Sequence, residues 1–362
     1  TLEMPHLQDA SGLLGDLDRE ANRLYTTKSM PSFTAAVLVD GELAWWRGFG
    51  VQDLSEGGPI AVTTVYRIAS ITKIITAMAA VMLRDEGKVS LDAPVGNWIP
   101  EIDAVVYPTQ ERPRITLRHL ITHTSGLPRV GPIDYVTDRT PPLSEGEILV
   151  ALRGLQLERT PGIESHYSNL GYAVLGLALG RAAGEPFADL VQRRLLQAMG
   201  MRCQWSLDAV SRAELATGYV REGYDLVPRH HWPMGAGEGM GGLYCSLDDM
   251  IRFASFQMTA WPPGGRPDRP PLSNASLRES QLGGGHQRVG GKQVGYGWQV
   301  GNAGKAGLMI WHTGSTHQYA SELVVLPDQR IAVVALTNVG DEALVSAFVG
   351  FARRRLMKEL GM

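Results

Sequence analysis

The chain has 362 residues, of which 44% are hydrophobic and 20% charged, so it can form one large domain or two with an ample core. Its formal net charge of −3 argues against nucleic acid as a partner. The sequence contains no apolar run of about 18 or more residues, the length that would predict a membrane span. Two cysteines, Cys203 and Cys245, exclude a scaffold of several disulfides but leave one bridge open. Because the sequence begins at Thr1 and not at Met, a periplasmic, secreted or cytoplasmic location stays open, as does the oligomeric state.

The first elements of the chain are a helix and a β-hairpin. Residues 9–28 have the spacing of an amphipathic helix. Phe33–Val39 and Leu43–Gly50 are strand-forming runs separated by the turn pair Asp40-Gly41, a pattern typical of a hairpin. We therefore expect two antiparallel strands in this region.

The next segment places a serine and a lysine at the start of a helix that is almost entirely apolar. Within Ile74–Leu83 only Thr76 is polar, so no face is left for water, and we expect this helix to be buried up to its end near Gly87. Ser70 and Lys73 are three residues apart and therefore lie on one face, close enough for a hydroxyl–amine hydrogen bond.

A lysine in such a helix requires an explanation, because an unpaired buried ammonium group costs several kcal/mol. Only six of the 34 basic residues are lysines, and Lys73 is one of them. Burial and the positive end of the helix dipole both depress the pKa of this amine, so that its neutral form can act as a base toward Ser70. The alternative is an N-cap serine followed by a lysine that extends to solvent. The buried helix favours the catalytic interpretation.

Residues from about 90 to 290 predict helices joined by loops that are rich in proline and glycine. Residues 128–144 and 261–271 contain too many of these residues for regular structure. A helix is predicted to begin at Ser246, where Asp249, three residues on, completes a capping box.

A second group of polar residues precedes an apolar helix predicted over Gly171–Leu179. Tyr167 and Asn169 are two apart on an extended stretch, so their side chains point the same way and can face one cavity. In a catalytic site the tyrosine would relay a proton, and the asparagine would orient the lysine and hold a substrate carbonyl. The alternative is a loop tyrosine with an asparagine that caps the helix.

Four further strands are predicted near the C-terminus, at residues 297–300, 308–311, 320–326 and 331–337. A closing helix then runs from about Glu342 to Leu360. His312, Gly314 and Ser315 follow the second of these strands, where a glycine allows a substrate backbone to approach and an N–H group can donate to an oxyanion. The alternative is an ordinary strand end with an exposed histidine.

Strands at both ends of the chain, with helices between them, predict an α+β fold. Its mostly antiparallel sheet is built from both termini and is flanked by helices. We assign residues 1–67 and 290–362 to this sheet domain and residues 68–289 to an inserted, mainly helical domain. We expect the active site at the junction of the two.

The remaining patterns indicate neither a metal nor a cofactor. His119 and His123 are four apart but lack the adjacent glutamate of the zinc proteases. Residues 283–292 are rich in glycine but lack the spacing of a phosphate-binding loop, so we expect a flexible loop. No Gly-x-Ser-x-Gly elbow occurs, which argues against an α/β-hydrolase. His230 and His231 have no evident partner and are expected at the surface.

Three motifs that occur in this order resemble the signature of the serine penicillin-recognising enzymes: Ser70-Ile71-Thr72-Lys73, Tyr167-Ser168-Asn169 and His312-Thr313-Gly314. The chain is most similar to the branch of the class C β-lactamases, D-alanyl-D-alanine carboxypeptidases, D-aminopeptidases and related esterases. The flanking stretches Leu120–Leu127 and Gly241-Gly242-Leu243 also resemble this family, over roughly residues 30 to 340. The resemblance implies a β-lactamase-like fold.

The resemblance also implies a role for each motif residue. Ser70 would be the nucleophile and Lys73 the base beside it. Tyr167 would pass the proton to the leaving group, as base or acid, so that either Lys73 or Tyr167 would deprotonate Ser70. Asn169 would contact Lys73 and the substrate. The backbone N–H groups of Ser70 and Ser315 would form the oxyanion hole.

His312 departs from the pattern of the class C β-lactamases, which have a lysine at this place. The departure resembles the carboxypeptidase, aminopeptidase and many esterase members, and a histidine supplies positive potential only near or below its pKa. We therefore expect a metal-free serine hydrolase that cleaves small esters or amides through an acyl-serine intermediate, as an esterase or a D-amino acid-type peptidase. The alternatives are a β-lactamase, an acyltransferase that uses the same site, and a non-catalytic binding protein of the same fold.

Overall fold

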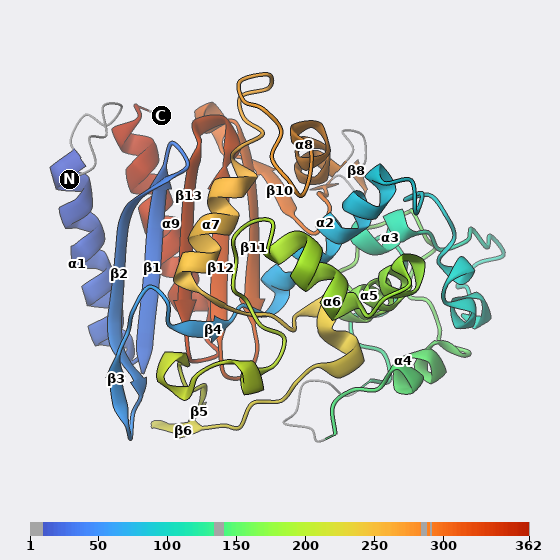
Figure 1. Ribbon diagram of the computed structural model, residues 1–362, viewed down its shortest axis with the longest axis horizontal. Helices are drawn as coiled ribbons and strands as arrows, with labels where there is room; N and C mark the ends of the chain where they lie inside the picture. The colour runs from blue at the N-terminus through green and yellow to red at the C-terminus, as the bar shows by residue number, and fades with distance from the viewer. Residues whose placement is uncertain (1–9, 134–140, 284–287, 290–291, 362) are drawn as a thin grey trace.

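An antiparallel sheet of seven strands, drawn from both ends of the chain, lies at the centre of the structure (Figure 1). The computed structural model describes residues 10–133, 141–283, 288–289 and 292–361. In spatial order the strands are β10 (Gln299–Asn302), β11 (Leu308–Ser315), β12 (Ala320–Leu326), β13 (Ile331–Thr337), β1 (Ser32–Val39), β2 (Glu42–Asp53) and β3 (Gly57–Pro59). β1 pairs with β13, so the N-terminal hairpin and the C-terminal strands form one sheet. The predicted α+β fold is confirmed.

The turn between β1 and β2 consists of Asp40 and Gly41, as the sequence predicts. Both residues have left-handed φ values, +56° and +81°, which a tight two-residue hairpin loop requires. All eight residues of β1 are buried. A strand that is buried along its whole length must be covered on both faces of the sheet.

Helices provide that cover. The α-helices of the described residues are α1 (Ala10–Lys28), α2 (Thr72–Asp85), α3 (Leu117–Ile121), α4 (Glu145–Leu152), α5 (Asn169–Ala183), α6 (Phe187–Val191), α7 (Leu247–Gln257), α8 (Asn274–Leu282) and α9 (Glu342–Glu359). α1 and α9 pack on one face, where Phe33 and Phe348 belong to a shared core (Figure 1). α7 crosses the opposite face, where Leu38 and Phe253 belong to a larger core that extends into the helical region.

The helical region lies beside the sheet, and α2 runs through it (Figure 1). Every residue of α2 from Thr72 to Leu83 is buried, which confirms the expectation from its composition. Short strand pairs complete this region: β4 (Val65–Arg67) with β7 (Tyr244–Ser246), β5 (Tyr219–Glu222) with β6 (Asp225–Pro228), and β8 (Arg288–Val289) with β9 (Lys292–Gln293). The division into domains after residues 67 and 289 stays a prediction.

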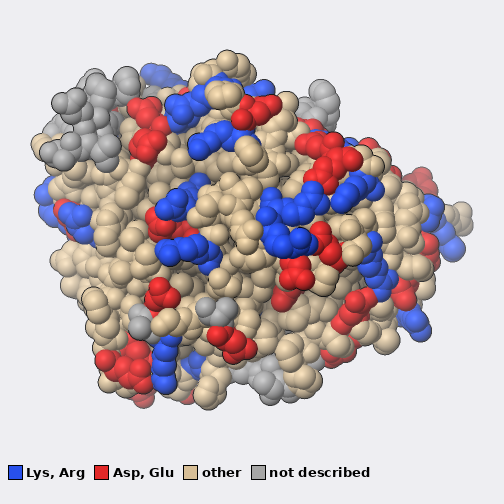
Figure 2. Space-filling view, viewed as in Figure 1, with Lys and Arg blue, Asp and Glu red and all other residues tan. Residues whose placement is uncertain are grey.

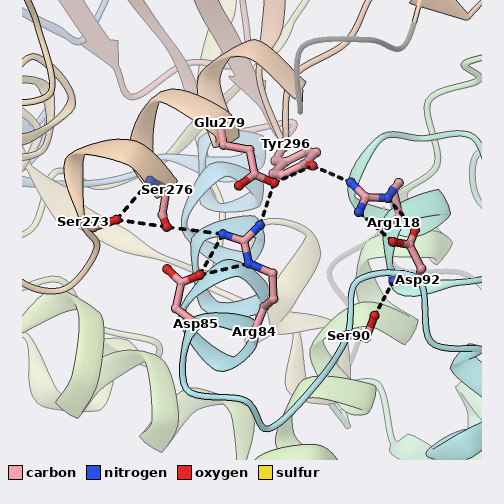
Figure 3. Close-up of polar contacts among 9 residues, drawn as sticks. All are labelled: Arg84, Asp85, Ser90, Asp92, Arg118, Ser273, Ser276, Glu279 and Tyr296. Atoms are coloured by element: carbon pink, nitrogen blue, oxygen red, sulfur yellow. Dashed lines mark hydrogen bonds and ion pairs between the residues drawn. The ribbon is translucent and has the colours of Figure 1, made fainter. Parts of the chain in front are cut away.

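A network of polar side chains connects the C-terminal end of α2 to its neighbours (Figure 3). Arg84 donates to Glu279 of α8 at 2.6 Å, and Glu279 also accepts a bond of 3.2 Å from the Tyr296 hydroxyl. Arg118 of α3 donates to the same hydroxyl at 2.6 Å and forms an ion pair with Asp92. These bonds hold the segment that precedes β10 against the helical region.

The predicted C-terminal strands differ from the observed ones mainly in length. Residues 320–326 and 331–337 form β12 and β13, as expected. β11 continues beyond residue 311 to Ser315, because it pairs with β12 as far as Ser315, which lies opposite Ala320. His312 therefore lies within a strand and does not follow it. The strand expected at 297–300 is displaced to β10.

The loop predictions are correct in part. Residues 283–292 were expected to be a loop, yet they contain β8 and the start of β9, while 284–287 and 290–291 lie outside the described residues. Residues 261–271 contain no helix or strand. Ser246 and Asp249 form the predicted capping box of α7. Cys203 and Cys245 are joined by a disulfide, which answers the question that the sequence left open.

Of the two histidines expected at the surface, His230 is exposed, whereas His231 departs from the expectation because its ring is partly buried. It stacks on Tyr319 and meets Tyr244 edge to face, with ring centroids 6.0 and 5.5 Å apart. Burial lowers the pKa of this histidine to about 4, with a contribution from Arg67. Tyr319 comes from a distant part of the sequence, and Tyr244 from the next strand, β7, so the local pattern did not predict this packing.

The surface carries basic and acidic residues that are mixed on the face shown in Figure 2. Ion pairs of the structure include Arg84 with Asp85 and Arg252 with Asp248. Within the part of the chain that the structure describes, every helix is too short or too polar to cross a membrane.

Candidate active site

Ser70 lies in a single 3-10 turn, Ala69–Ile71, that leads directly into α2. Ala69 has a φ of +47°, a left-handed conformation that residues with a side chain rarely adopt and that tends to occur at functional sites. The N-cap position of α2 is Ile71, and no side chain caps the helix. The alternative of an N-cap serine is therefore wrong.

Lys73 is buried completely, with 0% of its surface exposed. Its Nζ lies within hydrogen-bonding distance of Ser70 Oγ, at 3.1 Å, and donates to Asn169 Oδ1 at 2.7 Å. A third bond goes to the carbonyl oxygen of Met240, at the end of a 3-10 segment, Gly235–Met240. Burial, with a contribution from the nearby Arg129, holds the pKa of the amine well below its ordinary value of 10.5. The alternative of a lysine that extends to solvent is therefore wrong.

Tyr167 brings a second proton carrier to the same oxygen, since its hydroxyl donates to Ser70 Oγ at 2.8 Å. The ring of Tyr167 stacks on His123 with centroids 4.5 Å apart. His123 has a φ of +58°, and its Nδ1 accepts a bond of 3.1 Å from the Ser168 N–H group. This bond requires the proton of a neutral imidazole to be on Nε2.

The cap of α5 explains why Tyr167 and Asn169 reach the same place. Ser168 is the N-cap residue, and its Oγ accepts a bond of 2.9 Å from the Gly171 N–H group. The capping residue is therefore Ser168, and the alternative in which Asn169 caps the helix is wrong. With Ser168 in an extended conformation, the residues on its two sides can both turn toward Ser70 and Lys73.

His312 lies on β11 and is 98% buried, so the alternative of an exposed histidine is also wrong. Its ring centroid is 6.1 Å from that of Tyr167. Burial and the adjacent Lys73 lower the pKa of His312 to about 4. At neutral pH the imidazole is therefore uncharged, and the positive potential considered for this position is lost.

Replacing His312 with asparagine should reduce the loss of stability in mild acid. Between pH 4 and 6.5 the unfolded chain binds a proton at His312 that the folded protein excludes, so folding stability decreases as the pH falls through this window. From pH 7 to pH 5 this histidine should cost about 2 kcal/mol. Urea unfolding of the two proteins at both pH values tests this. An equal loss in both proteins would contradict a depressed pKa.

β11 also presents backbone N–H groups to the site. The Thr316 N–H group donates to the Tyr319 carbonyl, on the side of β12. Successive N–H groups of a strand point to opposite sides, so the even-numbered N–H groups of β11 point toward β12. The odd-numbered groups, including that of Ser315, point to the opposite edge. There β10 pairs only as far as Trp311, opposite Gln299, so among the described strands none covers the Ser315 N–H group.

Gly314 allows β11 to lie directly against the nucleophile turn. A Cβ atom at this position would be 2.2 Å from the Ile68 carbonyl oxygen and 3.1 Å from the Ser70 nitrogen. Real Cβ atoms do not approach backbone atoms so closely, so only glycine fits without a shift of the turn or the strand. The Ser70 nitrogen therefore lies close to β11 at Gly314, the residue before Ser315.

Gly314→Ala should therefore reduce both stability and any activity that depends on Ser70. We expect a loss of about 2 kcal/mol in unfolding free energy from overpacking, and a decrease of about 100-fold in kcat/KM from a displaced nucleophile. Gly146→Ala in α4 is the matched control, because a Cβ there has no atom within 4 Å. A Gly314→Ala protein with normal activity would show that the contact is unimportant.

A cleft of about 940 Å³ lies between the helical region and the edge of the sheet, and Tyr167, whose hydroxyl contacts Ser70 Oγ, forms part of its wall. The helical side contributes Thr122, His123, Ser165 and Tyr167, and the sheet side includes Trp298, Val300, Leu308 and Trp311. Polar side chains such as Gln293, Gln299 and Asn302 also line it, so the cleft suits a small ligand with both apolar and polar groups. Among the described residues, no group of three or more His, Cys, Asp or Glu side chains could hold a metal ion.

The structure adds three groups that the sequence analysis did not identify. Met240 contributes a carbonyl oxygen, which no side-chain pattern predicts. His123 had been considered only as a metal ligand with His119, although it belongs to a stretch that resembles the family. Arg129 lies over the Tyr167 ring, with Cζ 4.9 Å from the ring centroid, in a segment that had been considered only as a loop.

Comparisons with known proteins agree with this architecture. A model of the beta-lactamase family matches residues 17–348. Esterase EstB of Burkholderia gladioli is 28% identical to this chain over 377 aligned positions, which cover 93% of each protein.

Solved structures show the same fold. The octameric penicillin-binding protein homologue from Pyrococcus abyssi superimposes with a TM-score of 0.80 at 23% identity, over 95% of this chain and 77% of that chain. A beta-lactamase/D-alanine carboxypeptidase from Yersinia pestis gives a TM-score of 0.79 at 22% identity, over 96% of this chain and 99% of that chain. At these identities the likeness concerns the fold.

Proposed function

The chain belongs to the beta-lactamase family, and we propose that it is a serine hydrolase that cleaves small esters or amides through an acyl-serine intermediate. The observation that carries the proposal is the set of contacts around one hydroxyl. Lys73 Nζ and the Tyr167 hydroxyl lie 3.1 and 2.8 Å from Ser70 Oγ. A nucleophile with two proton carriers in direct contact is the arrangement that acyl transfer requires.

Lys73 is the base in this proposal. Asn169 Oδ1 and the Met240 carbonyl oxygen can only accept hydrogen bonds, so they take the two N–H groups of a neutral amine. The lone pair of the nitrogen is then left for the proton of Ser70. Because burial lowers the pKa of Lys73, this neutral form is available far below pH 10.5.

Acylation then proceeds in two steps. Ser70 Oγ attacks the carbonyl carbon while its proton passes to Lys73, and the oxyanion accepts bonds from the N–H groups of Ser70 and Ser315. The tetrahedral intermediate collapses, the bond to the leaving group breaks, and the leaving group takes a proton from Tyr167. Lys73 returns its extra proton to Tyr167.

Deacylation reverses the roles with water. A water molecule attacks the ester on Ser70 and gives up a proton to the Lys73–Tyr167 pair. The second tetrahedral intermediate collapses, Ser70 Oγ recovers a proton, and the acid leaves. Every group then has its initial protonation state, so no cofactor is needed for the balance of the cycle.

His312 favours an ester or a D-amino acid-type amide over a β-lactam. Because the pKa of His312 is about 4, its imidazole gives no positive charge for a substrate carboxylate at neutral pH. The relative EstB is named an esterase, which supports this order of preference.

Covalent labelling and a substrate panel test the proposal. A fluorophosphonate should add its phosphonyl mass to the intact protein, and peptide mapping should locate it on Ser70. The panel contains p-nitrophenyl esters of short and long acids, D-amino acid amides, a D-Ala-D-Ala peptide and a cephalosporin. A highest kcat/KM for an ester or a D-amino acid amide agrees with the proposal. A preference for the cephalosporin would contradict the ranking of substrates, and no label with no turnover would contradict the function itself.

A further inference from the structure

The amine of Lys73 and the guanidinium of Arg129 both lie over the ring of Tyr167. Lys73 Nζ and Arg129 Cζ are each 4.9 Å from the ring centroid. The two groups are therefore less than about 10 Å apart, a distance at which charges in a partly buried site still act on each other. Arg129 is exposed at the surface, whereas Lys73 is enclosed.

The backbone of Arg129 is fixed to the helix that carries Asn169. Its carbonyl oxygen accepts bonds from the N–H groups of Asn169 at 2.8 Å and Leu170 at 3.4 Å, in the first turn of α5. The adjacent Pro128 carbonyl accepts a bond of 2.8 Å from Ser168 Oγ. Because these structural contacts are made by the backbone, the side chain of Arg129 can be changed without breaking them.

The groups around the Lys73 amine differ in their charge at neutral pH. They are the phenols of Tyr167 and Tyr172, the imidazoles of His123 and His312, and the guanidinium of Arg129. Burial lowers the pKa of His312 to about 4 and that of His123 well below 6.5, so both are neutral. A guanidinium stays charged in proteins. Among these described groups, Arg129 is therefore the permanent cation.

We propose that Arg129 is a positioning residue that acts through its charge, which disfavours a second positive charge on Lys73 and keeps this amine free to accept the Ser70 proton. The inference rests on the proposed function and adds a regulatory element to it. Its direction agrees with the depressed pKa of Lys73, to which Arg129 contributes after burial. Arg129 should thereby extend the active range of the enzyme toward lower pH.

The experiment measures the rate of Ser70 acylation by a neutral fluorophosphonate against pH, so that substrate binding and product release do not enter. In Arg129→Gln the midpoint of the acid side of this pH–rate profile (the acid limb) should rise by about half to one pH unit. Below the midpoint the acylation rate should therefore be about 3- to 10-fold lower than in the natural protein. The rate at high pH should change by less than about twofold, since the amine is neutral there in both proteins. Arg129→Glu should give a larger rise.

Two control variants and a change of salt concentration separate charge from structure. Arg129→Lys keeps the charge and should restore the acid limb, which a purely structural role would not explain. Arg153→Gln removes an equal charge from an exposed arginine that pairs with Glu101, and it should leave the limb in place. Raising the salt from about 0.1 to 1 M shortens the screening length from about 10 to 3 Å, so it should shift the limb of the natural protein but not that of Arg129→Gln.

The outcomes distinguish this inference from the proposed function. If the natural protein is not labelled at Ser70 at any pH, the function itself is wrong. If it is labelled but Arg129→Gln keeps the original acid limb, only the role of Arg129 is wrong. An Arg129→Lys protein with the limb of Arg129→Gln would also overturn the inference, because charge would not be the property that matters.

Discussion

Ser70→Ala should lower kcat/KM for an activated ester by about 10⁴-fold or more, the largest effect expected of any single substitution in this protein. The alanine protein has no oxygen to attack the carbonyl carbon, so no acyl-enzyme forms. Intact-protein mass spectrometry after incubation with the ester should show no increment, in contrast to the natural protein. Stability should change little, since Ser70 does not cap α2 and its side chain is only half-buried.

Ser165→Ala is the matched control for this loss. Ser165 lines the same cleft, but its hydroxyl donates to the Thr122 carbonyl at 3.3 Å, with no bond to the nucleophile. The control should keep its activity within a few-fold of the natural protein. If Ser70→Ala and Ser165→Ala retained similar activity, another residue would be the nucleophile and the proposed mechanism would be wrong.

The sequence predicted the parts of this architecture that depend on local patterns. The spacing of Ser70 and Lys73, the apolar composition of α2 and the turn pair Asp40-Gly41 each correspond to what the structure contains. Such features follow from periodicity and turn chemistry within about 20 residues, which a single sequence displays directly. The catalytic roles assigned to the motif residues stay proposals until they are measured.

The features that could not be predicted depend on contacts between distant segments. Met240 reaches Lys73 through its backbone, and any residue type could supply that carbonyl. The depressed pKa of His312 follows from burial, which comes from helices that pack against the sheet. Arg129 and His123 both contact the ring of Tyr167, which lies about 40 positions further along the chain. These relations follow from the tertiary structure, which local patterns do not reveal.

Lys73→Met should reduce activity strongly while changing stability little. We expect a loss of about 10³-fold in kcat/KM, because no base remains to take the Ser70 proton. Stability near neutral pH should change by no more than about 2 kcal/mol. Methionine fills a similar volume and removes the cost of a buried amine, while Asn169 Oδ1 and the Met240 carbonyl lose a donor. Lys305→Met, at an exposed position, is the control for the loss of one lysine.

The pH dependence of stability provides a second test of the same substitution. Because the pKa of Lys73 is depressed in the folded protein, the unfolded chain binds more protons between that value and 10.5. Stability contributed by this group should therefore rise with pH through the window and reach its full value above 10.5. Urea unfolding of the natural protein between pH 7 and 10 should show this rise, and Lys73→Met should lack it. A rise of equal size in both proteins would show that Lys73 is charged in the folded state, and a charged Lys73 could not be the base.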